Sequence, residues 1–138
     1  MTLPFSHYLT AYGIAAVVFL GLDAIWLGTM ASRLYRPSIG HLMADGFSVA
    51  PAVIFYLLYL VGMVVFAIGP ALEARKPLQA LAMGALLGLI CYATYDLTNQ
   101  ATLKQWPWQV TVADLIWGTF VTGVASAVAT RLTLAWRG

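Results

Sequence analysis

Charged residues are scarce in this chain of 138 residues. Only 9% of them are charged, and the formal net charge is +2. Soluble domains carry charge on roughly a quarter of their residues, and disordered tails, coiled coils and nucleic-acid-binding domains depend on charge as well. The composition therefore excludes these classes, and we expect no nucleic-acid partner.

Cysteine and histidine are nearly absent. Cys91 is the single cysteine, so no disulfide can form within the chain. His7 and His41 have no second histidine or cysteine at ligand spacing, so we expect no metal centre and no cofactor. The sequence also lacks a serine-nucleophile motif and a glycine-rich phosphate loop. It leaves an enzymatic role open but favours a protein that is not an enzyme.

Hydrophobic residues make up 62% of the chain, and the mean hydropathy is +0.85. A membrane-spanning helix needs about 20 mostly apolar residues, and charges and prolines divide this chain into four such stretches. They are residues 8–30, 51–69, 78–98 and 110–132. We therefore predict an all-α integral membrane protein, a four-helix bundle that forms one domain over residues 1–138 in a lipid bilayer.

The connection between the first two predicted spans, residues 31–50, holds Arg33, Arg36 and Asp45 and is too polar to cross a membrane. It has enough apolar residues to form a short interfacial helix. The N-terminus has no Lys or Arg before its apolar run and no cleavage pattern, so we interpret the first span as retained rather than as a signal peptide.

Basic residues are almost evenly divided between the two sides of the predicted bundle. Four spans place both termini on one side, with four basic residues against three on the other. The positive-inside rule then favours cytoplasmic termini by a single charge. Small residues at Gly84 and Gly88, and at Gly123 and Ala127, predict close helix packing, either within one chain or between two copies.

Three of the five acidic residues lie inside predicted spans: Asp23, Asp96 and Asp114. Placing a carboxylate inside a membrane span costs free energy, so such a group usually faces a cavity or a partner. The first and third spans run in the same direction and the fourth begins where the third ends. All three acids should therefore lie near one membrane face, roughly 5 to 12 Å below the interface.

Each acid has a polar or aromatic residue three positions later, on the same helix face. The segments Asp23-Ala-Ile-Trp and Asp114-Leu-Ile-Trp also resemble each other, although matches this short arise by chance. We predict that the acids and their neighbours form an acidic cup that binds a ligand or a proton: Asp23, Trp26, Tyr56, Tyr92, Asp96, Asn99, Asp114 and Trp117. Two carboxylates brought close would share a proton. The alternative is that these groups only join helices by hydrogen bonds.

Several of these segments together resemble a known family. They are Leu22–Gly28, Phe55–Tyr59, Tyr92–Asn99 with Trp106 and Pro107, and Asp114–Gly118. They are similar to a bacterial family of small membrane proteins, domain of unknown function 2177, and the similarity extends over nearly the whole chain. The resemblance implies four spans and a location in the bacterial inner membrane, but no activity.

Three functions fit this pattern. The first is a binding or transport protein, as a homodimer or in a larger membrane complex, whose cup takes a small cationic or polar amphiphile or a lipid headgroup, with proton exchange at a carboxylate. The second is a lipid-modifying enzyme or a subunit of one. The third is a structural subunit of a larger membrane complex, in which the acids only hold helices together.

Overall fold

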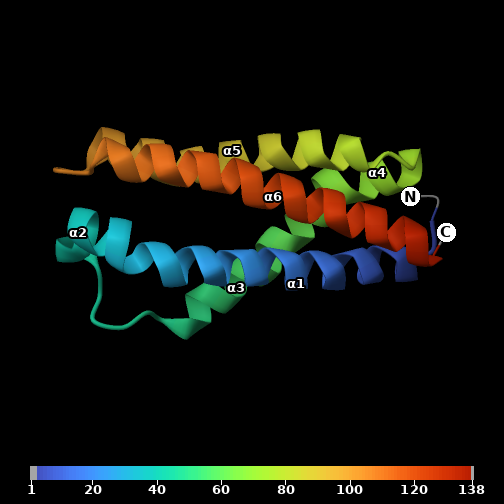
Figure 1. Ribbon diagram of the computed structural model, residues 1–138, viewed down its shortest axis with the longest axis horizontal. Helices are drawn as coiled ribbons and strands as arrows, with labels where there is room; N and C mark the ends of the chain where they lie inside the picture. Colours follow the sequence, from blue (N-terminus) through green and yellow to red (C-terminus); the bar gives the residue numbers. More distant parts are fainter. Residues whose placement is uncertain (1–2, 138) are drawn as a thin grey trace.

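The computed structural model describes residues 3–137, and all regular structure in this part of the chain is helical (Figure 1). Four helical segments are long and apolar enough to cross a membrane: Phe5–Leu42, Val49–Ala74, Pro77–Thr102 and Trp108–Arg137. Each contains one of the four predicted spans. The fold class predicted from hydropathy, a four-span helical bundle, is therefore confirmed.

The first segment continues well past its predicted end at residue 30. The helix α1 (Phe5–Met30) passes through a π-helical turn, η1 (Ala31–Tyr35), into α2 (Arg36–Ile39) and a last 3₁₀ turn, η2 (Gly40–Leu42). The helical structure expected within residues 31–50 is thus present, but it extends α1 instead of forming a separate helix. At 1.5 Å per residue such a segment is longer than the hydrocarbon core of about 30 Å, so one end projects beyond it.

The second segment also contains a π-helical turn. It consists of α3 (Val49–Met63), η3 (Val64–Ile68) and α4 (Gly69–Ala74). The wider turn η3 ends two residues before Pro70, whose ring would clash with the carbonyl group four residues earlier in a regular helix. The segment ends at Arg75, which adopts a left-handed conformation with φ of 58°.

The last two helices, α5 (Pro77–Thr102) and α6 (Trp108–Arg137), pack tightly along glycine residues. A Cβ atom added to Gly88 would lie 2.1 Å from the carbonyl oxygen of Gly118, and one added to Gly84 would lie 2.7 Å from Ser126 Oγ. Only glycine permits so close an approach. Gly84 and Gly88 therefore join helices within one chain.

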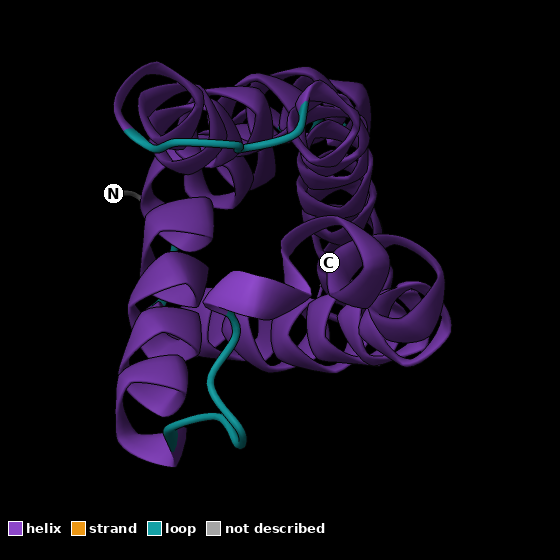
Figure 2. Cartoon of the chain, turned by 90° about the vertical axis from the view of Figure 1, so that its left-hand side faces the viewer, coloured by secondary structure: helices purple, strands orange, loops and turns teal. Residues whose placement is uncertain are grey.

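The helices α1 and α6 run antiparallel and pack against each other, whereas α3 is tilted strongly and diverges from the bundle toward its N-terminal end (Figures 1 and 2). Both termini lie at the opposite end of the bundle from α2 (Figure 1). There Tyr8 donates a hydrogen bond to Glu73 at 2.9 Å, and Arg137 donates one to Thr10 at 2.8 Å. These contacts tie the first segment to the second and to the fourth on that side.

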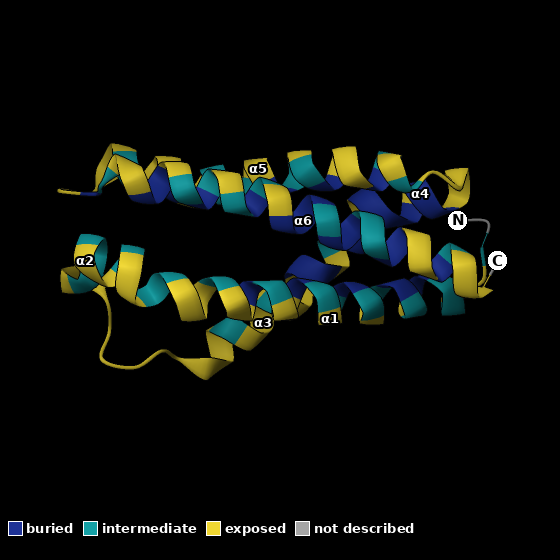
Figure 3. Ribbon diagram, viewed as in Figure 1, coloured by how far each residue is buried: buried dark blue, intermediate teal, exposed yellow. Residues whose placement is uncertain are grey.

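Burial follows the pattern of a membrane bundle (Figure 3). The core is formed by side chains from all four segments, with Phe19, Leu60 and Val121 among its buried members. Large apolar residues such as Val17 and Phe66 cover the outer faces. An apolar exterior of this kind suits lipid as the surrounding solvent.

Candidate ligand-binding site

The three intramembrane acids lie toward the same end of the bundle, the end away from both termini (Figure 1). Asp23, Asp96 and Asp114 each lie six or seven residues from the end of α1, α5 or α6 at that side. This places each of them about 10 Å along its helix from that end. Asp23 and Asp114 are 7% exposed, and Asp96 is fully buried.

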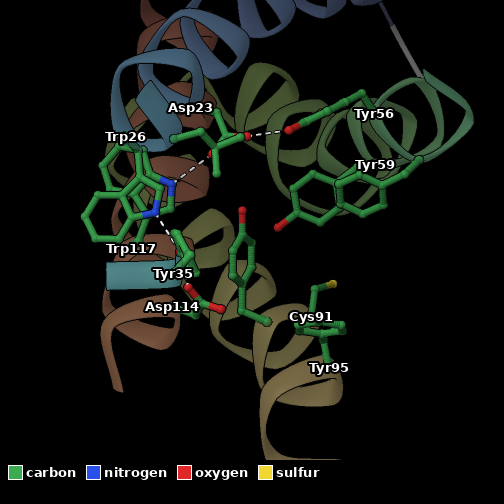
Figure 4. A pocket seen from close by; sticks show the side chains of 12 residues that line it. Asp23, Trp26, Tyr35, Tyr56, Tyr59, Cys91, Tyr95, Asp114 and Trp117 are labelled. Carbon is green, nitrogen blue, oxygen red and sulfur yellow. Dashed lines mark hydrogen bonds between the residues drawn. The ribbon is translucent and has the colours of Figure 1, made fainter. Parts of the chain in front are cut away.

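A cavity of about 380 Å³ opens beside these acids (Figure 4). Helices α1, α3, α5 and α6 and the turn η1 all contribute to its wall, and eight of the twelve lining residues are aromatic. The lining residues are Asp23, Trp26, Leu27, Tyr35, Phe55, Tyr56, Tyr59, Cys91, Tyr92, Tyr95, Asp114 and Trp117. The volume lies within the range of small-ligand sites in proteins.

Asp23 is held by two hydrogen bonds from neutral donors on other helices. The hydroxyl group of Tyr56, on α3, donates to one carboxylate oxygen, and Nε1 of Trp117, on α6, donates to the other at 3.1 Å (Figure 4). The tilted helix α3 is thereby tied to α1 and α6 at the cavity. Both donors are uncharged, so they stabilise the carboxylate without cancelling its charge.

Asp114 is held through a bridge formed by Tyr35. Trp26 donates a hydrogen bond from Nε1 to the Tyr35 hydroxyl at 2.8 Å, and that hydroxyl donates to the Asp114 carboxylate (Figure 4). The indole rings of Trp26 and Trp117 stack on each other. A continuous polar network therefore connects the two acids that line the cavity.

The π-helical turn η1 explains how Tyr35 reaches this network. Trp26 and Tyr35 are nine residues apart, about two and a half turns of a regular α-helix, which would place them on opposite faces. A π turn accommodates one extra residue and rotates the following segment by roughly 100° relative to a regular helix. Tyr35 is thus turned toward the cavity, where its hydroxyl can lie between Trp26 and Asp114.

Asp96 is not among the residues that line the cavity, and Asp114 is its acidic neighbour where α5 packs on α6. Within the described part of the chain, neither of its carboxylate oxygens has a donor from another residue. A buried carboxylate without a donor is energetically costly. A proton shared with Asp114 would give one of these oxygens a hydrogen-bond partner.

Six of the eight residues predicted for the acidic cup line the cavity: Asp23, Trp26, Tyr56, Tyr92, Asp114 and Trp117. Asp96 lies behind Asp114, and Asn99 lies beside Tyr95 and is not a lining residue. Of the residues left out of the prediction, Tyr59 and Tyr95 repeat the positions of Tyr56 and Tyr92 one helical turn later, a signal that the sequence does contain. Phe55, Cys91 and Leu27 carry no such signal, and neither does Tyr35.

The wall of the cavity includes exposed residues on α3 and on α5. Phe55 on α3 and Tyr95 on α5 both line it, yet they are 46% and 57% exposed. The neighbouring residues Ile54 and Ile90 are also exposed and apolar. Both helices belong to segments long and apolar enough to cross a membrane, so an opening of the cavity between them would face lipid.

The cavity is lined by acidic side chains and by no basic one among the described residues. Two carboxyl groups line it, and within residues 3–137 no Lys, Arg or His does so. In the same part of the chain, no three His, Cys, Asp or Glu side chains gather as the ligands of a metal ion would. The arrangement thus provides hydrogen-bond acceptors, negative charge and aromatic faces.

These features define a four-span helical membrane protein with an acidic, aromatic cavity near one end of the bundle. The chain belongs to the family DUF2177, described as predicted membrane protein, whose model matches residues 8–131. No curated protein and no solved structure matches the chain.

Proposed function

We propose that this protein binds a small amphiphile with an ammonium headgroup in the cavity, as part of a binding or transport function. The observation that carries the proposal is the combination of Asp23 and Asp114 with an aromatic wall that contains no basic side chain. Each further feature of the ligand follows from one property of the site.

The sign of the ligand's charge follows from the acids. Asp23 accepts hydrogen bonds only from Tyr56 and Trp117, which are neutral. Neutral donors do not cancel the charge of a carboxylate, and charge inside a membrane protein is stabilised by an opposite charge. A cation in the cavity supplies that partner.

The chemical type of the headgroup follows from the rings. Aromatic faces attract organic cations, and quaternary ammonium groups are recognised by aromatic cages of this composition. The stacked pair of Trp26 and Trp117, together with Tyr56, Tyr59 and Tyr92, surrounds the space next to Asp23. Such a wall favours an alkylammonium group over a small hydrated metal ion.

The amphiphilic character follows from the opening between α3 and α5. A ligand that reaches Asp23 through this opening passes Phe55 and Tyr95 and leaves its tail among exposed apolar side chains such as Ile54. An alkyl chain is therefore accommodated on the lipid side while the headgroup lies in the cavity. A lipid with an amine headgroup and a free cationic amphiphile share this chemistry.

The same proposal includes a location. The family resemblance supports the bacterial inner membrane, and the excess of one basic residue at the end with the termini supports cytoplasmic termini. The cavity would then lie near the outer face of that membrane.

Binding can be measured with dodecyltrimethylammonium as the probe, on the full chain in lipid nanodiscs, by quenching of tryptophan fluorescence. We expect saturable binding that dodecyl maltoside, an uncharged amphiphile with the same alkyl chain, does not reproduce. Asp23→Asn should weaken binding by about 10- to 100-fold, since it removes one close charge pair. Asp45→Asn is the matched control because Asp45 is exposed and lies outside the cavity.

Equal binding by wild type and Asp23→Asn would contradict the proposal and favour a purely structural role for the acids. Native mass spectrometry of protein extracted from its own membrane distinguishes the two ligand sources. A retained mass equal to an amine lipid identifies a lipid ligand, and a smaller retained mass identifies a free amphiphile. The same spectrum counts subunits and so tests the expected homodimer.

A further inference from the structure

Asp96 is the one intramembrane acid that the proposed ligand does not touch. It is fully buried on α5, does not line the cavity, and neither carboxylate oxygen has a donor from another described residue. Its neighbour is the carboxyl group of Asp114, which does line the cavity. A change in the charge or protonation of Asp114 therefore acts directly on Asp96.

Two adjacent carboxylates in a buried site cannot both keep a negative charge without a cation or a proton between them. The described part of the chain places no basic side chain in the cavity and gathers no set of three metal-ligand residues. A single proton shared by the pair gives one of the two orphaned oxygens of Asp96 a hydrogen-bond partner. It also leaves one net negative charge on the pair.

We propose that Asp96 and Asp114 form a proton-binding site that exchanges its proton for the cationic ligand of the cavity. This inference rests on the proposed function. When the ammonium group approaches Asp114, its positive charge stabilises the doubly ionised pair. The shared proton is then released to water as the cation enters, so the total charge of the site is unchanged.

The titratable groups around the pair are all acidic or phenolic. They are Tyr35 from η1, Asp23 from α1, and Tyr92 and Tyr95 from α5 itself. Tyr35 already donates its hydroxyl proton to Asp114, and the Asp23 oxygens already accept from Tyr56 and Trp117. Asp96 is therefore the carboxyl group of this set whose oxygens have no hydrogen-bond donor among the described residues.

The direction of the pH dependence follows from competition between the proton and the cation. Below the pH at which the pair loses its proton, each unit of increasing pH should raise ligand affinity by up to about tenfold, and about one proton should be released per cation bound. Above that pH, affinity should no longer change and no proton should be released.

The test uses the full chain in nanodiscs with dodecyltrimethylammonium, with affinity measured from pH 5 to 9 and proton release measured by an indicator dye in weak buffer. The variant is Asp96→Asn, whose amide can donate a hydrogen bond to Asp114 as a protonated acid would. We expect it to bind with an affinity independent of pH and without proton release. Asp45→Asn should behave as wild type.

Wild-type binding without pH dependence and without proton release would overturn this inference and leave the proposed function standing. So would an Asp96→Asn variant that still releases a proton. Absence of saturable wild-type binding at every pH would instead refute the proposed function. The number of protons that wild type releases per cation bound is measured without any variant. It therefore tests this inference even if Asp96→Asn does not fold.

Discussion

The indole rings of Trp26 and Trp117 stack with their centroids 4.6 Å apart and their planes at 7°. Each tryptophan lies three residues after an acid on its own helix, but its hydrogen bonds lead to the acid of the other helix. Trp117 donates directly to Asp23, and Trp26 donates to Asp114 through Tyr35. Because α1 and α6 run antiparallel, two Asp-x-x-Trp segments placed side by side give this crossed arrangement. The short sequence match between them thus has a structural counterpart.

The stacked pair should contribute to stability beyond the sum of its members. We predict that Trp26→Leu and Trp117→Leu are coupled by about 0.5–1.5 kcal/mol in a double-mutant cycle of the free energy of unfolding. Unfolding by dodecyl sulfate in mixed micelles provides the measurement. Trp26→Leu combined with Trp108→Leu is the control cycle, since Trp108 is exposed and its effects should add. Equal coupling in the two cycles would contradict a specific stacking contribution.

The Tyr35 hydroxyl should be needed for the shape of the cavity. In Tyr35→Phe the ring remains, but the partly buried Nε1 donor of Trp26 and the Asp114 carboxylate both lose their hydrogen bond to the hydroxyl group. Leaving buried polar groups unpaired costs about 1–3 kcal/mol each, so we expect lower stability and weaker binding of dodecyltrimethylammonium.

Tyr12→Phe is the matched control for this prediction. The Tyr12 hydroxyl donates to the Leu57 carbonyl at 3.0 Å in an exposed position outside the cavity. Its loss should lower stability by less than about 1 kcal/mol and leave binding unchanged. If the two Tyr→Phe variants bind the probe equally well, the bridge to Asp114 has no role in the site.

The number of spans and the end at which the acids gather could be predicted because hydropathy and helix direction follow from residue order. The extension of α1 through residue 42 could not, since Arg33 and Arg36 mark the end of an apolar run without marking the end of a helix. A polar helix that extends beyond the membrane has a hydropathy similar to that of a polar loop, so hydropathy does not distinguish the two. The link from η1 to α2 is therefore visible only in the structure.

Within the site, the residues found from the sequence are those one helical turn from an acid, such as Trp26 and Trp117. Tyr35 was missed because its position depends on a π turn, and the sequence carries no signal for a single extra residue in a helical turn. Asp96 is predicted as part of the cup, and the structure places it beside Asp114 but not in the cavity lining, a difference that residue order does not specify because it depends on helix rotation. The rotation of α5 that buries Asp96 beside Asp114 is set by its packing on α6.

The glycine contact between α5 and α6 should be among the most sensitive to substitution. A Cβ atom in Gly88→Ala would lie 2.1 Å from the backbone carbonyl oxygen of Gly118, which cannot move without shifting α6. We expect destabilisation of about 1–3 kcal/mol or more, as for other overpacked contacts. Gly13→Ala is the control, because a Cβ there meets nothing within 4 Å and alanine favours a helix. Similar unfolding curves for the two variants would contradict this packing.

The orientation in the membrane should be unusually easy to reverse. The link between α4 and α5 and the last part of α6 lie at the end with the termini (Figure 1), and they carry Arg75, Lys76, Arg131 and Arg137. The segment from η1 to α2 and the link between α5 and α6 lie at the other end, and they carry Arg33, Arg36 and Lys104. Since orientation follows the balance of basic residues near the spans, we predict cytoplasmic termini for the natural sequence. Replacing Arg75 and Lys76 with Gln leaves two basic residues against three, so a substantial fraction of molecules should invert.

Reporter fusions at the C-terminus provide the measurement, with alkaline phosphatase active only outside the cytoplasm and a fluorescent protein that matures only inside it. The control replaces Arg33 and Arg36 with Gln, which increases the existing bias and should leave the termini cytoplasmic. A natural sequence with phosphatase-active termini would place the cavity near the cytoplasmic face. The opening between α3 and α5 would then admit amphiphiles from the inner leaflet, because the cavity lies at the end away from the termini in either orientation.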